Sequence, residues 1–318
     1  MEQEIQDFSA DQTDAKRVFH GRGGCYPGCE HLTLDWFPPV WLLTSHNIQL
    51  SNDTIFSVHD MLPDKTNIPK PTNMSIHNDK MNKNVINLVY QFRNDTGAET
   101  RIISGGVPKP HVVTENGMKF LVGIASGKNN GIFLDMANGR KWVQENTKDQ
   151  NVLNMFAYTC GFSVAALGGG GAAQVVNIDM AGGPMKNGKR NHDLNNLQGA
   201  RFLTHNIFKT WGKLRKLGPY DTIIVDPPSF QRNSFVASKD YCKILRRLPD
   251  FLKDNGKVLL CLNAPSLDST WLKNQVEGEA PSLEFLERLP NPDSFPDADP
   301  ERSLKVLLFQ KKSSTECQ

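Results

Sequence analysis

Three short segments of the chain place polar or small residues directly after runs of apolar residues. The first is NMFAYTCGFS at 154–163, the second ends in Asp179, and the third is DPPSF at 226–230. In doubly wound sheets, ligands bind beyond the carboxyl ends of the strands. If the apolar runs are neighbouring strands, the three segments predict one ligand site.

The first two segments suit a ligand that contains a nucleoside. Gly161 would let the backbone approach a ligand closely, and the N-terminus of a helix that follows it favours a negatively charged group. Asp179 comes 18 residues after Gly161, a separation that suits an acidic residue contacting ribose hydroxyls. Each feature alone is also typical of an ordinary turn or a helix cap, so the prediction rests on their combination.

The third segment is the most specific one. Asp226 is followed by Pro227 and Pro228, and prolines stiffen the chain so that a carboxylate and nearby carbonyl groups are held in one direction. This arrangement suits the binding of a polar planar group. We interpret Asp226 as the reacting end of the site.

The elements that must position these segments alternate between short apolar strands and helices. Strands are predicted at 152–156, 175–179, 222–226, 257–262 and 304–309, and helices at 136–148, 162–167 and 239–248. Such alternation is typical of a parallel sheet covered on both faces. We therefore expect a doubly wound, Rossmann-like α/β domain over residues 141–318.

The part of the chain before residue 141 has a different pattern of residues, without the alternation of strands and helices. We predict a flexible tail over residues 1–17 and a small β-rich substrate or accessory module over residues 18–140, including a hairpin over 120–135. Pro38 and Pro39 are expected to exclude a central strand from the aromatic stretch around them.

Composition places the chain in an ordinary class. Its 318 residues carry a formal charge of +2, with 22% charged and 38% hydrophobic residues, as in a soluble globular protein. The lack of a signal-peptide or membrane-length apolar run, with six scattered cysteines, predicts a cytoplasmic protein. Cys25 and Cys29 lie near His20 and His31, but not at standard zinc spacing, so we expect no metal.

These segments give the chain a resemblance to a known family. It resembles the class I methyltransferases that use S-adenosylmethionine (SAM), a family that includes the bacterial 23S ribosomal RNA enzymes making 5-methylcytosine and 7-methylguanine. The similarity covers roughly residues 110–310, with NMFAYTCGFSVAAL, VVNIDM, YDTIIVDPPSF and SFVASKDYCKILRRLPDFL as its motifs. The resemblance implies a SAM cofactor.

The resemblance also implies roles for individual residues. The SAM contacts that it implies are Phe133, Asp135, Asn154, Phe156, Tyr158, Thr159, Gly161, Asp179, Met180, Asn206 and Ile207. It places Asp226 at the point of methyl transfer, and we expect Pro227, Pro228, Phe230 and Asn263 to line the same catalytic region. Two departures from the family pattern are Cys160, where a second glycine is frequent, and Asn206, where Asp is common.

The type of acceptor follows from the cysteine pattern. Carbon-5 methylation of cytosine needs a nucleophilic Cys, which such relatives carry just past the strand that follows Asp-Pro-Pro. Here Cys261 lies inside the apolar strand and is predicted to be a buried small hydrophobe. We therefore expect methylation of a base nitrogen, with Asp226 and Asn263 bonding the base edge and Phe230 stacking on it.

The expected substrate is RNA, with ribosomal RNA favoured by the resemblance. Four basic residues share one face of the predicted helix after Phe230 and could contact phosphates: Lys239, Lys243, Arg246 and Arg247. An ordinary solvated face has the same pattern. Two alternatives stay open, a methyltransferase for a protein or small molecule and a non-catalytic SAM- or RNA-binding protein. The sequence does not indicate an oligomeric state.

Overall fold

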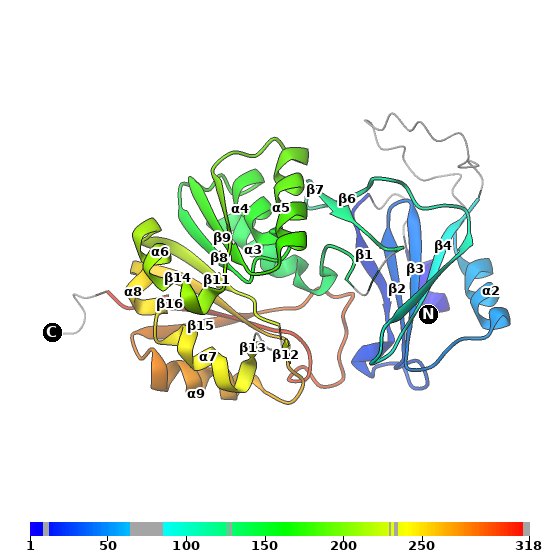
Figure 1. Cartoon of the computed structure of the whole chain (residues 1–318). Helices are drawn as coiled ribbons and strands as arrows, with labels where there is room; N and C mark the ends of the chain where they lie inside the picture. The colour runs from blue at the N-terminus through cyan, green and yellow to red at the C-terminus, as the bar shows by residue number, and fades with distance from the viewer. Residues whose placement is uncertain are drawn as a thin grey trace. The chain divides into compact units, whose positions relative to one another are not determined.

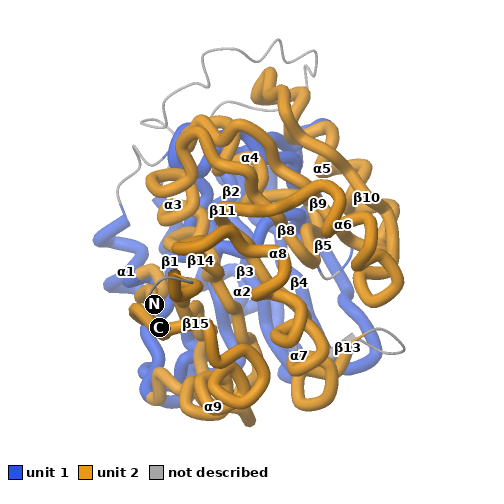
Figure 2. Tube along the Cα trace, turned by 90° about the vertical axis from the view of Figure 1, so that its left-hand side faces the viewer, with its two compact units in different colours: residues 1–134, 293–298 blue, residues 135–292, 299–318 orange. Residues whose placement is uncertain are grey.

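The computed structural model divides the chain into two compact units. It describes residues 1–8, 13–63, 85–125, 127, 129–228, 230–231 and 235–313, with the backbone alone described at 230–231. Unit 1 comprises residues 1–134 and 293–298, and unit 2 comprises residues 135–292 and 299–318 (Figure 2). The division falls after Leu134 instead of near residue 140. The late segment joins unit 1 where the Ala298 N–H donates a hydrogen bond to the Gly23 carbonyl over 2.8 Å.

Unit 1 is built on a five-stranded sheet of order β1-β2-β3-β4-β5 (Figure 1). Its strands are β1 (Lys16–His20), β2 (Leu32–Phe37), β3 (Val40–His46), β4 (Asn87–Arg93) and β5 (Ala98–Ser104). The β3–β4 pair is parallel and the other three pairs are antiparallel. The other described elements are the helices α1 (Glu2–Gln6) and α2 (Asn52–Met61), the 3-10 helix η1 (Gly21–Gly23), and the hairpin of β6 (His111–Glu115) and β7 (Met118–Val122).

The apolar face of this sheet forms the core of unit 1. Trp36 and Trp41 are paired across β2 and β3 and are 0% and 2% exposed. Pro38 and Pro39 occupy the turn between these two central strands, so the expectation that they exclude a strand is wrong. A turn residue needs no ladder hydrogen bond, and proline is therefore tolerated there.

Two further expectations for unit 1 differ from the structure. Residues 2–6 form α1, whose Ile5 is 3% exposed within the core, so this part of the expected tail is packed. The hairpin expected over residues 120–135 lies earlier in the chain, because β7 pairs with the preceding β6. Residues 134–136 form the 3-10 helix η3.

Unit 2 contains a seven-stranded sheet of order β10-β9-β8-β11-β14-β16-β15. Its strands are β8 (Asn151–Met155), β9 (Gln174–Asp179), β10 (Ala200–Thr204), β11 (Tyr220–Val225), β14 (Leu252–Leu262), β15 (Leu283–Leu289) and β16 (Lys305–Lys311). The strands from β10 to β14 are parallel, whereas β16 is antiparallel to both of its neighbours. A short ribbon pairs β12 (Phe230–Gln231) with β13 (Phe235–Val236).

Helices cover both faces of this sheet, as the sequence predicts (Figure 1). On one face lie α3 (Ala137–Asn146), α4 (Gly161–Gly168) and α5 (Gly182–Leu194). On the other lie α6 (Trp211–Leu217), α7 (Ala237–Leu245), α8 (Leu248–Phe251) and α9 (Ser269–Glu279). Successive residues of a strand point to opposite faces. Val152 accordingly packs with the first group of helices and Leu153 with the second.

The order of the strands in the sheet of unit 2 indicates where a ligand would bind. The chain runs outward from β8 through β9 to β10 and then returns to form β11 on the other side of β8. Ligands bind at such a switch point in doubly wound sheets. The segments that end in Asp179 and Asp226 both lie at this edge of the sheet. No described helix has the length and the apolar character needed to cross a membrane.

Candidate active site

The loop that leaves β8 has an unusual backbone. Phe156, Tyr158 and Cys160 have φ angles of 57°, 47° and 61°, all in the left-handed region. Each such residue with a side chain costs roughly 1–2 kcal/mol relative to the right-handed form. Surrounding contacts must therefore hold this loop in place.

Hydrogen bonds from neighbouring elements hold the loop. The Ala157 N–H donates to the Ile178 carbonyl over 3.1 Å, and the Cys160 N–H donates back to the Ala157 carbonyl over 2.6 Å. Asn191, from α5, donates its side-chain amide to the Thr159 carbonyl over 3.0 Å. The loop is thus held by β9 and by α5, although Asn191 lies 32 residues later in the sequence.

Asp179 connects the ends of three strands. One carboxylate oxygen accepts the Tyr158 N–H and the other accepts the Ala181 N–H, each over 2.8 Å. The Asp179 carbonyl accepts the His205 N–H over 3.0 Å. A carboxylate oxygen can accept more than one hydrogen bond, so Asp179 keeps acceptor capacity for ligand hydroxyls. Met180 beside it is 46% exposed and offers an apolar surface.

The residues expected at an adenine ring have unequal access. Asn206 begins the 3-10 helix η4 (Ile207–Lys209), and its side-chain carbonyl accepts the Phe208 N–H over 2.9 Å. That oxygen retains a second lone pair. Ile207 is only 5% exposed and packs in the core, so it offers little surface to a ligand.

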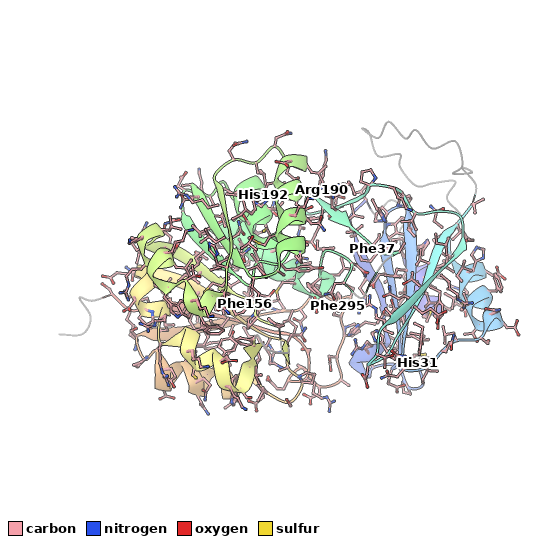
Figure 3. The ribbon with its side chains drawn as sticks, in the orientation of Figure 1. His31, Phe37, Phe156, Arg190, His192 and Phe295 are labelled. Atoms are coloured by element: carbon pink, nitrogen blue, oxygen red, sulfur yellow. The ribbon has the colours of Figure 1, made fainter. Side chains whose placement is uncertain are left out.

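The side chain of Asn154 lies in a buried polar chain, its Oδ1 has no hydrogen-bond partner among the described residues, and its expected contact with the cofactor stays a prediction. Asn154 is 1% exposed and donates to Asn177 over 2.9 Å, and Asn177 donates to the Ser163 hydroxyl over 2.9 Å. Ser163 lies 2.8 Å from Nε2 of His192, whose Nδ1 lies 2.7 Å from the Gly188 carbonyl (Figure 3). A carbonyl only accepts, so Nδ1 carries the proton and Ser163 donates to Nε2.

Gly161 allows two helices to pack closely, while its expected approach to a ligand stays a prediction. It is not among the residues with positive φ. A Cβ at this position would lie 3.3 Å from Cδ of Arg140, a residue of α3 that is 4% exposed. The absence of a side chain thus lets α3 and α4 pack closely and places Arg140 against the start of α4.

Asp226, directly after β11, is an acid with a strongly raised pKa. Burial, with the negative charge of Asp135 adding to its effect, raises the pKa of the Asp226 carboxyl to about 7, while the positive charge of Arg140 acts in the opposite direction. Pro227 is buried and Pro228 half-buried behind it. Two acids and one arginine therefore act on one another at this end of the sheet, and the sequence analysis missed Arg140.

Cys261 is unsuited to act as a nucleophile. It is 0% exposed within β14, and burial raises the pKa of its thiol well above the usual value. The thiolate is the nucleophilic form. The Tyr241 hydroxyl donates to the Cys261 carbonyl over 2.9 Å, which fixes this part of the strand to α7.

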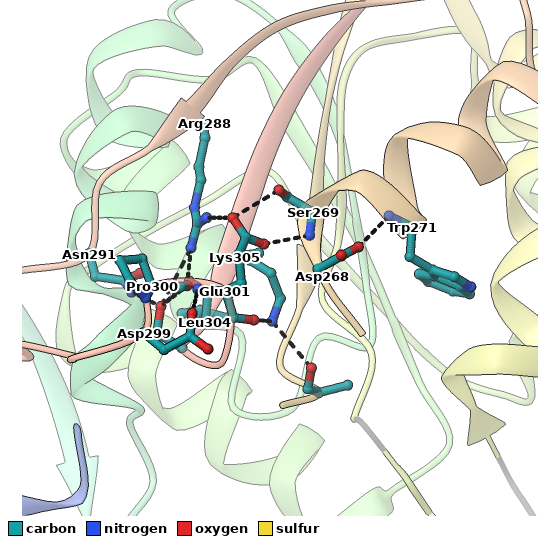
Figure 4. Close-up of polar contacts among 12 residues, drawn as sticks. Asp268, Ser269, Trp271, Arg288, Asn291, Asp299, Pro300, Glu301, Leu304 and Lys305 are labelled. Carbon is teal, nitrogen blue, oxygen red and sulfur yellow. Dashed lines mark hydrogen bonds and ion pairs between the residues drawn. The ribbon is translucent and has the colours of Figure 1, made fainter. Parts of the chain in front are cut away.

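Asn263, just beyond β14, is exposed. The loop that follows it is held by a polar network around Lys305 and Glu301 (Figure 4). Lys305 donates to the carbonyls of Ala264 and Glu301 over 3.2 and 2.6 Å. Glu301 in turn accepts from the Ser269 N–H and from Arg288, each over 2.6 Å. The network joins the end of β14 to α9 and β16 and so fixes the position of Asn263.

Aromatic packing supports the other side of the loop. Phe156 forms an edge-to-face pair with Phe235 at a centroid distance of 5.2 Å, and Phe235 contacts Tyr241 at 6.2 Å (Figure 3). The Phe230 side chain, expected to stack on a base, lies outside the described residues. Phe133 is 47% exposed in unit 1, and its approach to a cofactor stays a prediction.

The predicted basic helix face is shorter in the structure and is partly neutralised by nearby acids. The helix α7 ends at Leu245, so Lys239 and Lys243 lie on it, whereas Arg246 and Arg247 lie between α7 and α8. All four side chains are exposed. Lys243 pairs with Asp240 over 2.7 Å, and Arg246 pairs with Glu279 through two contacts of 2.5 and 2.7 Å. In the described parts of the chain, His, Cys, Asp and Glu side chains do not gather as a metal site would require.

The fold and the site together define a class. A doubly wound sheet with an acidic residue at the end of its second strand, beside a strand-to-helix loop, is the arrangement of proteins that bind nucleoside-containing cofactors. Residues 16–310 match the family model described as S-adenosylmethionine-dependent methyltransferase, and the chain belongs to this family. Its cofactor is therefore SAM.

Two relatives carry more specific names. The ribosomal RNA large subunit methyltransferase I of Aeromonas salmonicida is 39% identical, over 57% of this chain and 47% of its own length. YwbD of Bacillus subtilis, named a candidate ribosomal RNA large subunit methyltransferase, is 28% identical over 96% of this chain and 76% of its own length. The chain spans about half the length of the Aeromonas relative.

Solved structures share the fold. A candidate SAM-dependent methyltransferase from Streptococcus mutans superposes with a TM-score of 0.75 and 23% identity, over 97% of this chain and 80% of its own. A methyltransferase from Agrobacterium tumefaciens gives 0.66 and 15%, over 96% and 92%. At these identities the likeness concerns the fold alone.

Proposed function

We propose that this chain transfers the methyl group of SAM to a base nitrogen in RNA, and that the RNA is ribosomal. The observation that carries the proposal is Asp226, a carboxyl with a pKa of about 7 directly after β11 and next to the cofactor strand β8. An exocyclic amino group, or a ring nitrogen that carries a hydrogen, must lose a proton when it gains a methyl group. A carboxylate with a pKa near the working pH is well matched to accept that proton.

The residues around the loop after β8 fit the cofactor. SAM supplies a methyl group activated by a sulfonium. The start of α4 and the backbone of residues 156–161 would hold the methionine part, since a helix N-terminus favours a carboxylate. Asp179 would accept hydrogen bonds from the ribose hydroxyls. Met180 and Asn206 would border the adenine. Asp135 would lie on the Asp226 side, since its charge acts on that carboxyl.

The buried thiol at the end of β14 supports nitrogen as the acceptor atom. Carbon-5 chemistry needs a thiolate that attacks the base. Cys261 has no exposed surface and a raised pKa. Asp226 and Asn263 instead offer a proton acceptor and an amide, which together suit a base edge with both donors and acceptors.

The proposal of RNA as substrate is supported by the names of the relatives and by the exposed cations on and just after α7. Lys239 of α7 and Arg247, just before α8, are the two of these four cations for which no ion pair is found among the described residues. Such cations can neutralise phosphates. The cytoplasmic location expected from the sequence belongs to the same proposal.

The test is a transfer assay with SAM labelled in its methyl group. Total RNA and total protein from a strain that lacks the gene are offered as substrates and then fractionated. We expect the label in one ribosomal RNA species, and digestion to nucleosides should place it on a base nitrogen. Asp226→Asn should bind SAM and transfer nothing.

Other outcomes would replace the proposal. Label at carbon 5 of cytosine would reject the assignment of the acceptor atom. Label in protein or in a small-molecule fraction would select a different class of methyltransferase. If no fraction is labelled and equilibrium dialysis detects no SAM binding, the chain is a non-catalytic protein.

A further inference from the structure

The sheet of unit 1 has a second, polar face that the proposed function does not use. Arg17 of β1 is paired with Asp35 of β2, and His46 of β3 is paired with Arg93 of β4. Side chains two residues apart on a strand share a face. Asp35, His46 and Arg93 thus lie on the face opposite to that of the core tryptophan Trp36. Arg17 and Arg93 are therefore cations of the same face of the sheet.

Among the described residues, Asp35 is the only carboxylate that forms an ion pair with an arginine of this face. It is 3% exposed and receives two hydrogen bonds from Arg17, of 2.6 and 3.1 Å. Arg17 also contacts Nδ1 of His20 over 2.7 Å and lies over the ring of Phe295 at 4.6 Å. Arg17 thus bonds both oxygens of Asp35, and its guanidinium also packs on the ring of Phe295 from the late segment 293–298 (Figure 3).

Two more guanidinium groups lie near this pair without a carboxylate of their own. Arg22, on η1, is exposed and makes neither an ion pair nor a side-chain hydrogen bond within the described parts of the chain. Arg93 donates to the side chain of Gln91 but forms no ion pair with any described residue. Desolvation lowers the pKa of both guanidinium groups. The charge of Asp35 raises the pKa of Arg93, whereas the charge of Arg17 lowers the pKa of both groups. The three arginines therefore act electrostatically on one another.

The histidines of the cluster are neutral. Burial and the nearby arginines lower the pKa of His20 and His46 to about 3. Three arginines against one carboxylate leave two positive charges uncompensated at neutral pH. A second acid, Asp297, packs beside Gly23, yet it is not among the groups that shift the pKa of Arg22.

An unsatisfied hydroxyl lies on the same face. Thr44 is two residues before His46 and is 2% exposed. Its Oγ1 has no hydrogen-bond partner among the described residues. Buried polar groups are normally hydrogen-bonded, so this face carries both excess positive charge and an unused donor.

We propose that Arg17, Arg22 and Arg93 form an anion site on unit 1 that binds a phosphate of the RNA backbone. Guanidinium groups bind phosphate oxygens through paired N–H donors, and their charge is always present. Arg22 is the exposed member that first meets the anion, and Arg17 is fixed by Asp35 and Phe295. The choice of RNA rests on the proposed function.

The test measures RNA affinity and cofactor affinity separately on the full chain. A short fluorescein-labelled single-stranded RNA is titrated with the wild type, Arg22→Ala, Arg22→Lys and Arg93→Gln at several salt concentrations. Lys16→Ala is the matched control, because Lys16 is an exposed cation of β1 and neighbours Arg17 on the opposite face. Equilibrium dialysis with labelled SAM measures the cofactor affinity of each variant and so checks that the site in unit 2 is intact.

We expect Arg22→Ala to weaken RNA binding about tenfold, as for a lost hydrogen bond to a charged group, and to lower the slope of log K against log salt by about 0.7. Arg22→Lys should keep part of the RNA affinity that Arg22→Ala loses, and Arg93→Gln should also bind RNA more weakly. Lys16→Ala should bind RNA like the wild type. All variants should bind SAM with wild-type affinity. A merely structural role would leave the salt slope unchanged.

Two different failures can be told apart. If the wild type methylates RNA while Arg22→Ala and Arg93→Gln bind RNA with wild-type affinity and slope, the anion site is rejected and the proposed function stands. If the wild type neither binds nor methylates RNA, the proposed function fails, and the assignment of this site to an RNA phosphate fails with it.

Discussion

One carboxylate oxygen of Asp179 lies 2.8 Å from the backbone nitrogen of Tyr158. This hydrogen bond connects the end of β9 to the left-handed loop after β8. The same side chain that is proposed to hold the ribose thus also holds the loop proposed to contact the methionine part. SAM affinity should therefore be sensitive to Asp179 for two reasons.

Asp179→Ala is expected to weaken SAM binding. Hydrogen bonds to charged groups contribute roughly 1.5–3 kcal/mol each, so the dissociation constant should rise at least tenfold in a calorimetric titration. Asp193→Ala removes an exposed acid of α5 and serves as the control. Wild-type affinity in Asp179→Ala would reject both roles.

The pH dependence of methyl transfer should follow Asp226. The ionised carboxylate is the proton acceptor, and its pKa is about 7. The rate should therefore fall as the pH drops below about 7. Asp226→Asn should abolish transfer while SAM stays bound, which a transfer assay and a titration on the same sample can check.

Asp135→Asn provides a sharper test of the same site. Removing the negative charge of Asp135 should lower the pKa of Asp226, because that charge helps to raise it. The midpoint of the pH–rate profile should then move to lower pH. A midpoint that stays in place would mean that another group controls the profile.

The raised pKa of Asp226 should also make folding stability depend on pH. Its folded-state pKa of about 7 lies above the ordinary 3.8, so its favourable contribution is complete below 3.8 and is lost as the pH rises through 7. Asp226→Asn cannot ionise. It should raise the melting temperature at pH 8 by a few degrees and have no such effect at pH 4.

The contact between Gly188 and Cys160 should couple the two positions. A Cβ on Gly188 would lie 2.5 Å from the Cys160 sulfur, too close for any side chain. Gly188→Ala should cost about 1–3 kcal/mol of unfolding free energy and weaken SAM binding. Adding Cys160→Gly should recover most of this loss, since it removes the clash and relaxes the left-handed φ of 61°. Additive effects in urea unfolding would contradict the contact.

His192 should make the protein less stable in acid. Burial lowers the pKa of its imidazole below the usual 6.5, so its contribution is complete above 6.5 and is lost as the pH falls through the folded-state value. Protonation would also place a hydrogen on Nε2, which then could no longer accept from Ser163. Urea unfolding at pH 7.5 and 5.5 should show a smaller acid loss for His192→Gln than for the wild type. His205→Gln, at an exposed position, should resemble the wild type.

The type of domain, and the edge of the sheet at which the site lies, could both be predicted from local sequence patterns. The apolar runs before Phe156, Asp179 and Asp226 are local patterns, and a parallel sheet brings the ends of neighbouring strands together. The cofactor family could be predicted for the same reason, because its motifs lie on these three strand ends.

The contacts between side chains of distant segments could not be predicted, because they arise from the packing of the folded chain. Arg140 contacts Gly161, and Asn191 reaches the Thr159 carbonyl, because helices that are separate in sequence pack on one face of the sheet. Asn154 turned out to bond Asn177 because strand alternation directs it toward α4 and α5. The late segment 293–298, which contains Phe295, belongs to unit 1 although most of unit 2 lies between them in the sequence. No local pattern encodes such contacts, since they depend on register and on which helix face becomes buried.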